Sequence, residues 1–437
     1  MADKMIKVLH LTAHLGGGVG KALSGLVCQS LVSGADVKHT IVTFEQQEKN
    51  QFVELIKVSG AEVFASPLPE LLCELVEASD IVQLEWWNHP ATIKALCAQS
   101  FPPMRLIVWS HVSGLFNPII PRGLLLAAHQ FLFTSACSYE AKEVLSLPWE
   151  VAGQMRVVSS SGGFDGLPMP ESKDYETLVA GYIGSLNFAK LHPRYVDFLS
   201  AVSIPEFKVS LIGDVINKEV LEGECGKAGR QGMLEFRGYT NDVVSELSPV
   251  NVLIYLLNPE HYGTTENALL EAMAMGIVPI VLNNPAERFI VKDRETGFVV
   301  NSPEEFGEVI EWLYDNPNEM KRIGRRAAES VRTRFAVEVL EASLNNRYGS
   351  LVSSRIKQYV CFKDIFGEDP FEWFVSCQGN KAIFNSDFDL ERAISAFSGY
   401  GLIENTKGSV FHFQRYFPEN SKLNFLANRL NQLKGEK

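Results

Sequence analysis

Two series of short apolar segments, each followed by an amphipathic stretch, constrain the fold of this chain more than any other feature. The first series comprises residues 6–11, 37–44, 61–64, 81–84, 105–109 and 130–133, and the second comprises 178–183, 208–212, 234–236, 252–256 and 278–282. This alternation is typical of parallel sheets, because parallel strands need a crossover connection that a helix supplies. The sequence therefore predicts two doubly wound α/β domains.

The boundaries of these domains follow from breaks in the alternation. It stops at residues 166–170, Gly-Leu-Pro-Met-Pro, and the charged run 171–174 that follows is typical of an exposed linker. We therefore predict a first domain over residues 1–170 and a second over 171–350. Residues 351–437 depart from the pattern and are rich in aromatic clusters, so we assign them to an appended α+β extension without a defined role.

Charge and cysteine content exclude several classes of function. The 437-residue chain has 40 Lys and Arg against 52 Asp and Glu, a net charge of −12, which disfavours nucleic acid as a partner. Its seven cysteines are widely spaced and include no Cys-x-x-Cys pair, as expected for reduced thiols. No segment reaches the roughly 18 apolar residues that a bilayer span requires, and the N-terminus has no apolar signal core. We therefore expect a cytoplasmic protein.

The first predicted strand leads into a glycine-rich turn at residues 15–21, Leu-Gly-Gly-Gly-Val-Gly-Lys. Gly17 and Gly18 allow the backbone N–H groups to approach a phosphate or a sugar closely. The turn does not satisfy the P-loop pattern, because Leu15 and Ala22 occupy positions that require Gly and Ser or Thr. It also lacks the third glycine of a dinucleotide fingerprint, where Lys21 stands. A turn that binds no ligand remains the alternative.

The most informative segment is residues 258–281, which follows the predicted buried strand 252–256 and comprises a loop, a helix and a second buried strand. We expect Thr264 or Thr265 to cap the helix, whose N-terminus favours a diphosphate. Glu271 interrupts an apolar run, so its carboxylate needs a partner, such as a ribose diol or a neighbouring cation. Glu266 in the first turn is explained equally well by function and by the helix dipole alone.

The run Leu269-Leu270-Glu271-Ala272-Met273-Ala274-Met275-Gly276 resembles the signature of retaining GT-B glycosyltransferases of the family 4 type, the glycosyl transferases group 1. Further segments fall in the order of that family, namely the glycine turn and residues 80–84, 184–190, 211–214, 236–239 and 296–300. The resemblance spans roughly residues 5–345. It implies a GT-B fold, with two Rossmann-like domains facing a central cleft, the donor held mainly by the second and the acceptor by the first.

The resemblance also implies roles for single residues. Glu271 matches a glutamate that binds the ribose of a sugar nucleotide, Lys190 matches a lysine that neutralises the donor diphosphate, and His111 matches a histidine near the donor sugar. Without the resemblance, His111 is more simply a structural histidine at a strand end. The predicted catalytic set is His111, Lys190 and Glu266, and the predicted donor-binding set is Gly17, Gly18, Lys190, Thr264, Thr265 and Glu271.

Two positions depart from the family pattern. Gly263 stands where the first of two signature glutamates is expected, eight residues before the second. Glu266 and Glu260 are possible substitutes for it. Ser185 occupies the place of a phosphate-binding arginine, and Arg194 is a nearby candidate to compensate.

The sequence therefore predicts a retaining transferase that moves a sugar from a nucleotide-diphosphate donor to a glycan or a lipid-linked acceptor, in bacterial surface polysaccharide synthesis and without a metal or other cofactor. A non-catalytic GT-B homologue that acts as a binding or scaffold subunit is the alternative, motivated by Gly263. A nucleotide-dependent oxidoreductase is disfavoured by the glycine spacing.

Two weaker motifs complete the list of candidates. Asp387 and Asp389 form an Asp-x-Asp motif, which can mark a metal–diphosphate site but is short enough to arise by chance. The basic run 321–326, with Arg332 and Arg334 beyond it, suggests peripheral contact with anionic lipids, although a solvated helix face explains it as well.

Overall fold

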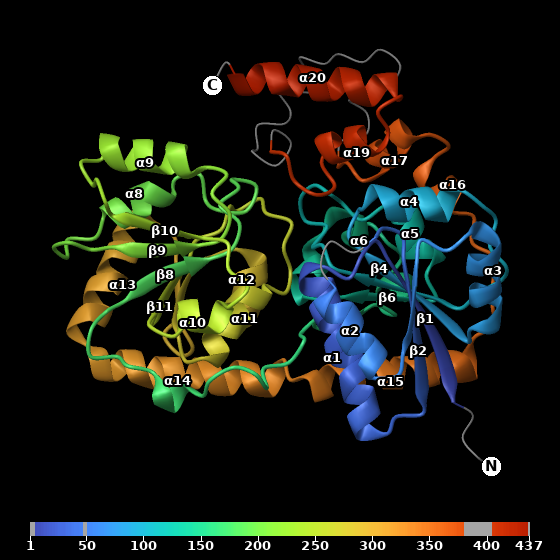
Figure 1. Ribbon diagram of the computed structural model, residues 1–437, viewed down its shortest axis with the longest axis horizontal. Helices are drawn as coiled ribbons and strands as arrows, with labels where there is room; N and C mark the ends of the chain where they lie inside the picture. Colours follow the sequence, from blue (N-terminus) through green and yellow to red (C-terminus); the bar gives the residue numbers. More distant parts are fainter. Residues whose placement is uncertain (1–4, 47–49, 380–403, 436–437) are drawn as a thin grey trace. The chain divides into compact units, whose positions relative to one another are not determined.

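The computed structural model describes residues 5–46, 50–379 and 404–435, and the chain divides into two compact units (Figure 1). The first unit combines residues 1–163 with 337–437, and the second comprises residues 164–336. Each unit is built around its own parallel sheet.

The first unit contains a seven-stranded parallel sheet in the order β3-β2-β1-β4-β5-β6-β7. Its strands are β1 (Ile6–Thr12), β2 (Val37–Thr43), β3 (Glu62–Ala65), β4 (Ile81–Trp86), β5 (Leu106–Ser110), β6 (Gln130–Phe133) and β7 (Arg156–Val157). The helices of the N-terminal part are α1 (Gly17–Ser33), α2 (Gln51–Val58), α3 (Pro69–Ala78), α4 (Pro90–Cys97), α5 (Arg122–Ala127), α6 (Lys142–Leu145) and α7 (Trp149–Ala152). The six predicted strands are confirmed, and the two-residue β7 is added to them.

The second unit contains a six-stranded parallel sheet in the order β10-β9-β8-β11-β12-β13. Its strands are β8 (Ala180–Ile183), β9 (Val209–Ile212), β10 (Leu234–Gly238), β11 (Val252–Tyr255), β12 (Val278–Leu282) and β13 (Phe298–Val300). Its helices are α8 (Tyr195–Ser200), α9 (Lys218–Lys227), α10 (Val243–Leu247), α11 (Asn267–Ala274), α12 (Pro285–Ile290), α13 (Pro303–Asp315) and α14 (Pro317–Arg334). The strand order reverses between β8 and β11, and the loops beyond such a reversal are where ligands bind in open α/β sheets.

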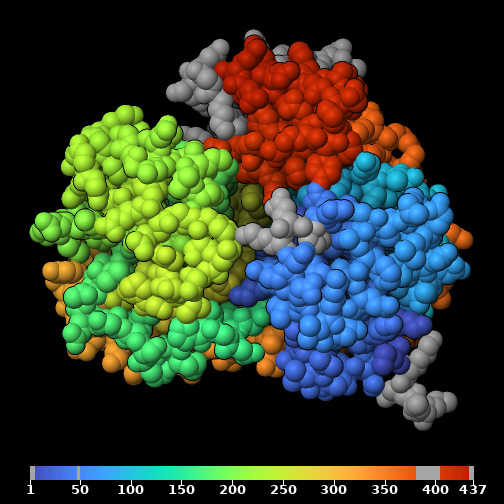
Figure 2. Space-filling view, viewed as in Figure 1, coloured from blue at the N-terminus to red at the C-terminus, as the bar shows by residue number. Residues whose placement is uncertain are grey.

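The C-terminal part of the chain belongs to the first unit. It forms α15 (Val337–Ser354), α16 (Phe362–Phe366), α17 (Pro370–Ser376), α19 (Val410–Tyr416) and α20 (Ser421–Gly435). Leu340, Leu344 and Leu351 of α15 are buried in the same core as α1, so residues 337–350, predicted with the second domain, pack with the first unit. Helices α16, α17 and α19 pack against α4 (Figure 1). In the space-filling view, the red and orange C-terminal segment lies against the blue N-terminal part of the same unit (Figure 2). The predicted aromatic clusters join α17 to α19, where the ring centroids of Phe374 and Phe413 lie 5.5 Å apart.

The basic residues of α14 have internal partners at its C-terminal end. Arg332 donates to the carbonyl oxygens of Ala274 and Leu167, and Arg334 donates to that of Phe289. These two guanidinium groups therefore link α14 to neighbouring segments of the second unit. Among residues 5–46, 50–379 and 404–435, none of the helices is both long enough and apolar enough to cross a bilayer.

Helix α14 can approach the end of α11 closely because residue 324 is a glycine. A Cβ atom at Gly324 would collide with the carbonyl oxygen of Gly276, to which the Tyr175 hydroxyl donates a hydrogen bond of 2.7 Å. We expect Gly324→Ala to lower the free energy of unfolding by about 1–3 kcal/mol, measured by urea denaturation, because the added methyl group forces the helix outward.

Gly349 of α15 is the matched control, since a Cβ atom there meets nothing within 4 Å. Gly349→Ala is expected to stabilise the protein by up to about 1 kcal/mol through helix propensity. Equal effects of the two substitutions would contradict this account of the α11–α14 packing.

Candidate functional site

Lys190 lies in the loop that follows β8 and is held there by backbone contacts. The Asn258 backbone N–H donates to the Lys190 carbonyl oxygen over 2.7 Å, and the Asn258 side chain donates to that of Phe188 over 2.7 Å. The Asn187 side chain in turn accepts a bond from the Ala189 N–H. These bonds join the loop after β8 to the loop after β11, so the position of the lysine depends on both.

The side chain that meets Lys190 is Glu266. Lys190 Nζ lies 2.8 Å from Glu266 Oε2, and the Tyr255 hydroxyl donates to the same oxygen over 2.7 Å. Glu266 is only 4% exposed and occupies the N-cap position of α11. The prediction that Thr264 or Thr265 caps this helix is therefore wrong. Both threonines precede the cap, and the Glu266 carboxylate binds Lys190 rather than a backbone N–H of the first turn.

The Lys190–Glu266 pair is strongly stabilised in its charged form. Burial alone would raise the pKa of Glu266, but the Lys190 ammonium and His261 outweigh it and lower that pKa to about 2. Burial likewise works to lower the pKa of Lys190, and the Glu266 carboxylate reverses the effect and raises it. Both groups are therefore charged at neutral pH, which places a fixed ammonium beyond the strands of the second sheet.

Gly263, the position of the missing signature glutamate, lies directly against this pair. A Cβ atom built at residue 263 would collide with the Glu266 carboxylate oxygen. The Gly263 N–H donates to His261 Nδ1 over 3.0 Å, and His261 Nε2 lies 3.1 Å from a carboxylate oxygen of the buried Glu287. The Glu266 side chain therefore occupies the space that a side chain at position 263 would need.

Glu271, Arg194 and Glu260 are other candidate residues of the second unit. Glu271 is partly exposed on α11, between buried apolar neighbours. Arg194 donates to Asp197 over 2.7 Å at the exposed start of α8, and Glu260 is exposed in the loop after β11. The Asp387–Asp389 motif lies outside the described residues. Among the predicted residues, Lys190 and Glu266 are joined by an ion pair.

Gly17, Gly18 and His111 lie in the first unit. Gly17, with φ +61°, and Gly18 are exposed at the start of α1, as expected for a turn that presents backbone N–H groups. His111 follows β5, and its Nε2 lies 2.8 Å from Oε2 of Glu85, a β4 residue with no exposed surface. The other Glu85 oxygen is 3.1 Å from His10 Nδ1.

This carboxylate is the end of a buried hydrogen-bonded chain that the sequence analysis missed. His10 Nε2 lies 3.0 Å from His39 Nδ1, and His39 Nε2 lies 3.1 Å from the Ser30 hydroxyl. Burial would raise the pKa of Glu85, but the hydrogen bonds from His10 and His111 outweigh it, so the pKa is lowered. The available signal was the occurrence of His10 and Glu85 inside otherwise apolar strands, because buried polar groups need partners. The ionised Glu85 therefore fixes the orientation of the His111 ring.

Two Rossmann-like units with these strand orders define a GT-B fold, the fold of a large class of glycosyltransferases. Residues 169–330 match the family model described as Glycosyl transferases group 1, which confirms the resemblance to that group over this part of the chain. The matched range contains Lys190, Glu266 and Glu271. A comparison with curated protein sequences finds no match.

Solved structures of glycosyltransferases share this fold. HepE of Anabaena in complex with UDP has a TM-score of 0.61 at 17% identity, covering 79% of this chain and 100% of its own. The lipopolysaccharide outer core galactosyltransferase WaaB has a TM-score of 0.56 at 17% identity, with 79% and 100% covered. Sucrose-phosphate synthase of Thermosynechococcus elongatus has a TM-score of 0.57 at 15% identity, with 80% and 100% covered. At these identities the comparisons establish the fold alone.

The Lys190–Glu266 pair predicts a specific response to Lys190→Met. Removal of the ammonium is expected to raise the pKa of Glu266 well above 2, as measured by carboxyl ¹³C NMR, and to cost about 3 kcal/mol of stability at pH 7. In the unmodified protein, the contribution of Glu266 is complete above the unfolded-state pKa of about 4.3 and is lost as the pH falls toward 2. The free energy of unfolding of Lys190→Met should therefore decrease much less over the same pH range.

Lys208 provides the matched control, because it pairs with Glu235 over 3.3 Å with side chains 57% and 47% exposed. Lys208→Met is expected to change stability by less than about 1 kcal/mol at any pH between 3 and 7. If the free energy of unfolding of Lys190→Met fell with decreasing pH as steeply as that of the unmodified protein, the proposed coupling would be contradicted.

Proposed function

We propose that this protein is a retaining glycosyltransferase that moves a sugar from a nucleotide-diphosphate donor to a glycan or a lipid-linked acceptor. The observation that carries the proposal is the ammonium of Lys190, held by Glu266 within the part of the chain that matches glycosyl transferases group 1. Breaking the bond between the anomeric carbon and the diphosphate increases negative charge on the leaving group. A preorganised ammonium that meets this charge lowers the barrier.

The surroundings of Lys190 suit this task. The ammonium is partly exposed, with 27% of its side chain accessible, so a diphosphate oxygen can reach it while two loops hold its backbone. Helix α11 begins at Asn267, and its N-terminal N–H groups add partial positive charge next to the pair. Glu271, partly exposed four residues further on, is assigned to the ribose hydroxyls, and Thr264 and Thr265 to the diphosphate.

The displacement of the acidic group from Gly263 to Glu266 favours an enzyme over a non-catalytic homologue. The Glu266 carboxylate fills the space beside Gly263 and pairs with Lys190, so a buried acid is still present at this end of the site. A protein that had lost its activity together with the signature glutamate would not need another buried carboxylate, such as that of Glu266, at this place. We assign Glu266 to the positioning of Lys190.

The first unit is assigned to the acceptor and to the donor sugar. His111 is fixed by Glu85 over 2.8 Å and is well placed beyond β5 to hydrogen-bond a sugar hydroxyl. Gly17 and Gly18 present exposed backbone at the start of α1. The likeness to WaaB, named for a lipopolysaccharide outer core, supports bacterial surface polysaccharide synthesis as the setting. The proposal further places the protein in the cytoplasm and assigns it no resident metal.

The decisive experiment measures nucleotide release and melting temperature for the purified chain with UDP-, GDP- and ADP-sugars. We expect one nucleotide sugar to raise the melting temperature and to be turned over when a suitable acceptor is present. Lys190→Met should lower kcat about 100-fold or more, because an electrostatic contact to the leaving group is lost. Lys208→Met, in an exposed pair, should leave kcat unchanged.

The pattern of results separates the alternatives. Binding of a nucleotide sugar without turnover, across a broad acceptor screen, would support a scaffold subunit instead. Equal turnover in Lys190→Met and Lys208→Met would refute the role of Lys190, and inversion at the anomeric carbon, detected by product NMR, would refute the retaining mechanism.

A further inference from the structure

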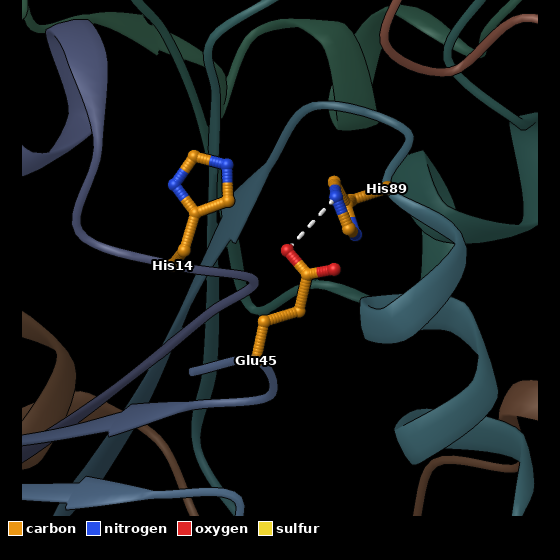
Figure 3. A group of neighbouring side chains, drawn as sticks. All are labelled: His14, Glu45 and His89. Atoms are coloured by element: carbon orange, nitrogen blue, oxygen red, sulfur yellow. Dashed lines mark ion pairs between the residues drawn. The ribbon is translucent and has the colours of Figure 1, made fainter. Parts of the chain in front are cut away.

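A second cluster of polar side chains lies in the first unit, beyond the carboxyl ends of β1, β2 and β4. His14, Glu45 and His89 point toward one another from the three loops that follow these strands (Figure 3). The C-terminal segment completes the cluster. Lys407 Nζ lies 3.2 Å from His14 Nε2, and the rings of His412 and His89 are 4.6 Å apart.

Backbone contacts fix the tautomer of each histidine in this cluster. The Nδ1 atoms of His14, His89 and His412 accept hydrogen bonds from the backbone N–H groups of Gly16, Ala91 and Gly408, over 2.9, 3.2 and 2.8 Å. An amide N–H only donates, so each Nδ1 carries a lone pair and each neutral ring carries its proton on Nε2. Burial lowers the pKa of these histidines to about 4, about 2 and about 4, so all three rings are neutral at pH 7.

The cluster consequently holds more donors than acceptors. His89 Nε2–H donates to Glu45 Oε2 over 3.3 Å, so this carboxylate is already engaged. His14 Nε2–H and the Lys407 ammonium face each other as two donors. Within the described part of the chain, no carboxylate pairs with Lys407, whose ammonium lies 5.6 Å from the Trp87 ring centroid. The Trp87 indole Nε1 is itself buried without an acceptor among the described residues.

A metal ion does not fit this arrangement. The potential ligand atoms of His14, Glu45 and His89 lie within 4.8 Å of one another, which is close enough for one cation. However, a ligating imidazole needs its lone pair on the atom that faces the metal and usually donates its other N–H to a second-shell acceptor. In this cluster the Nδ1 lone pairs accept from backbone N–H groups, and the Nε2 atoms carry the protons. The Lys407 ammonium would also repel the ion. An oxygen anion, in contrast, accepts from both facing donors.

We propose that His14, Trp87 and Lys407 form an oxyanion-binding subsite, filled by a carboxylate or phosphate group of an acidic sugar acceptor. The anion accepts hydrogen bonds from His14 Nε2–H and Lys407 Nζ, and the aromatic ring of Trp87 offers a surface for the attached pyranose. The assignment of the anion to an acceptor rests on the proposed function, whereas the binding site itself does not. Lys407 lies outside the segment matched to glycosyl transferases group 1, so the subsite is a property of this chain's own extension.

The test is a titration of the full chain with methyl glucuronide, glucose 1-phosphate and the neutral methyl glucoside, monitored by NMR of ¹³C-labelled histidine rings. The His14 signal is identified by its absence in His14→Gln. We expect one of the anionic sugars to shift this signal and the glucoside to leave it unchanged, and the tighter anion identifies the source as carboxylate or phosphate. Lys407→Gln should raise the Kd at least about tenfold, as expected for loss of a charged hydrogen bond.

Lys422 is the control, because it is exposed in the same C-terminal segment and lies 5.3 Å from the Phe371 ring centroid. Lys422→Gln should leave the Kd unchanged. Equal binding by Lys407→Gln and Lys422→Gln, equal binding of the glucoside, or Zn²⁺ binding that depends on His14, Glu45 and His89 would overturn the proposal. Nucleotide-sugar stabilisation is measured in parallel, so a failure of the proposed donor site is seen independently of this subsite.

Discussion

The ion pair between Lys190 and Glu266 is the interaction on which the candidate donor site depends. Lys190 lies in the loop after β8, and Glu266 lies at the end of the loop after the neighbouring strand β11. Both loops must follow a defined path for the two side chains to lie 2.8 Å apart. Taking both charges out of water is costly, and the pair is tolerated because Tyr255 and the loop hydrogen bonds satisfy the groups around it. The sheet therefore supplies a positioned cation rather than a flexible surface lysine.

The first unit also contains a buried carboxylate that positions a neighbouring side chain. Glu85 lies on a central strand with no exposed surface and orients His111, as Glu266 orients Lys190. In both cases a buried carboxylate keeps a lowered pKa because the donor it positions stabilises its charge. A carboxylate of this kind needs no contact with substrate to affect catalysis, since it fixes a group that extends beyond the end of the sheet.

Local pattern was sufficient to predict most strands, and the family resemblance singled out Lys190, but neither predicted the partners of the site residues. Apolar runs determine where buried strands form, and eleven strands of the two sheets followed from them, whereas the short β7 and β13 did not. The choice between Glu266 and Glu271 as the acid beside Lys190 depends on the direction of each side chain around α11, which the motif does not specify. The packing of α15 and the meeting of His14 with Lys407 join residues hundreds of positions apart, so only the tertiary structure reveals them.

The C-terminal extension bears on how a chain with the GT-B fold gains specificity. HepE, WaaB and sucrose-phosphate synthase are each covered completely but match only 79–80% of this chain, so about a fifth of it has no counterpart in them. Packing against α4 places part of that extension, Lys407 and His412, beside the loops after β1 and β4. Under the proposed assignments, a charge added there selects among acceptors, while the Lys190–Glu266 pair lies in the other compact unit and keeps its own contacts. An appended segment can in this way change acceptor choice while the chemistry of transfer is left intact.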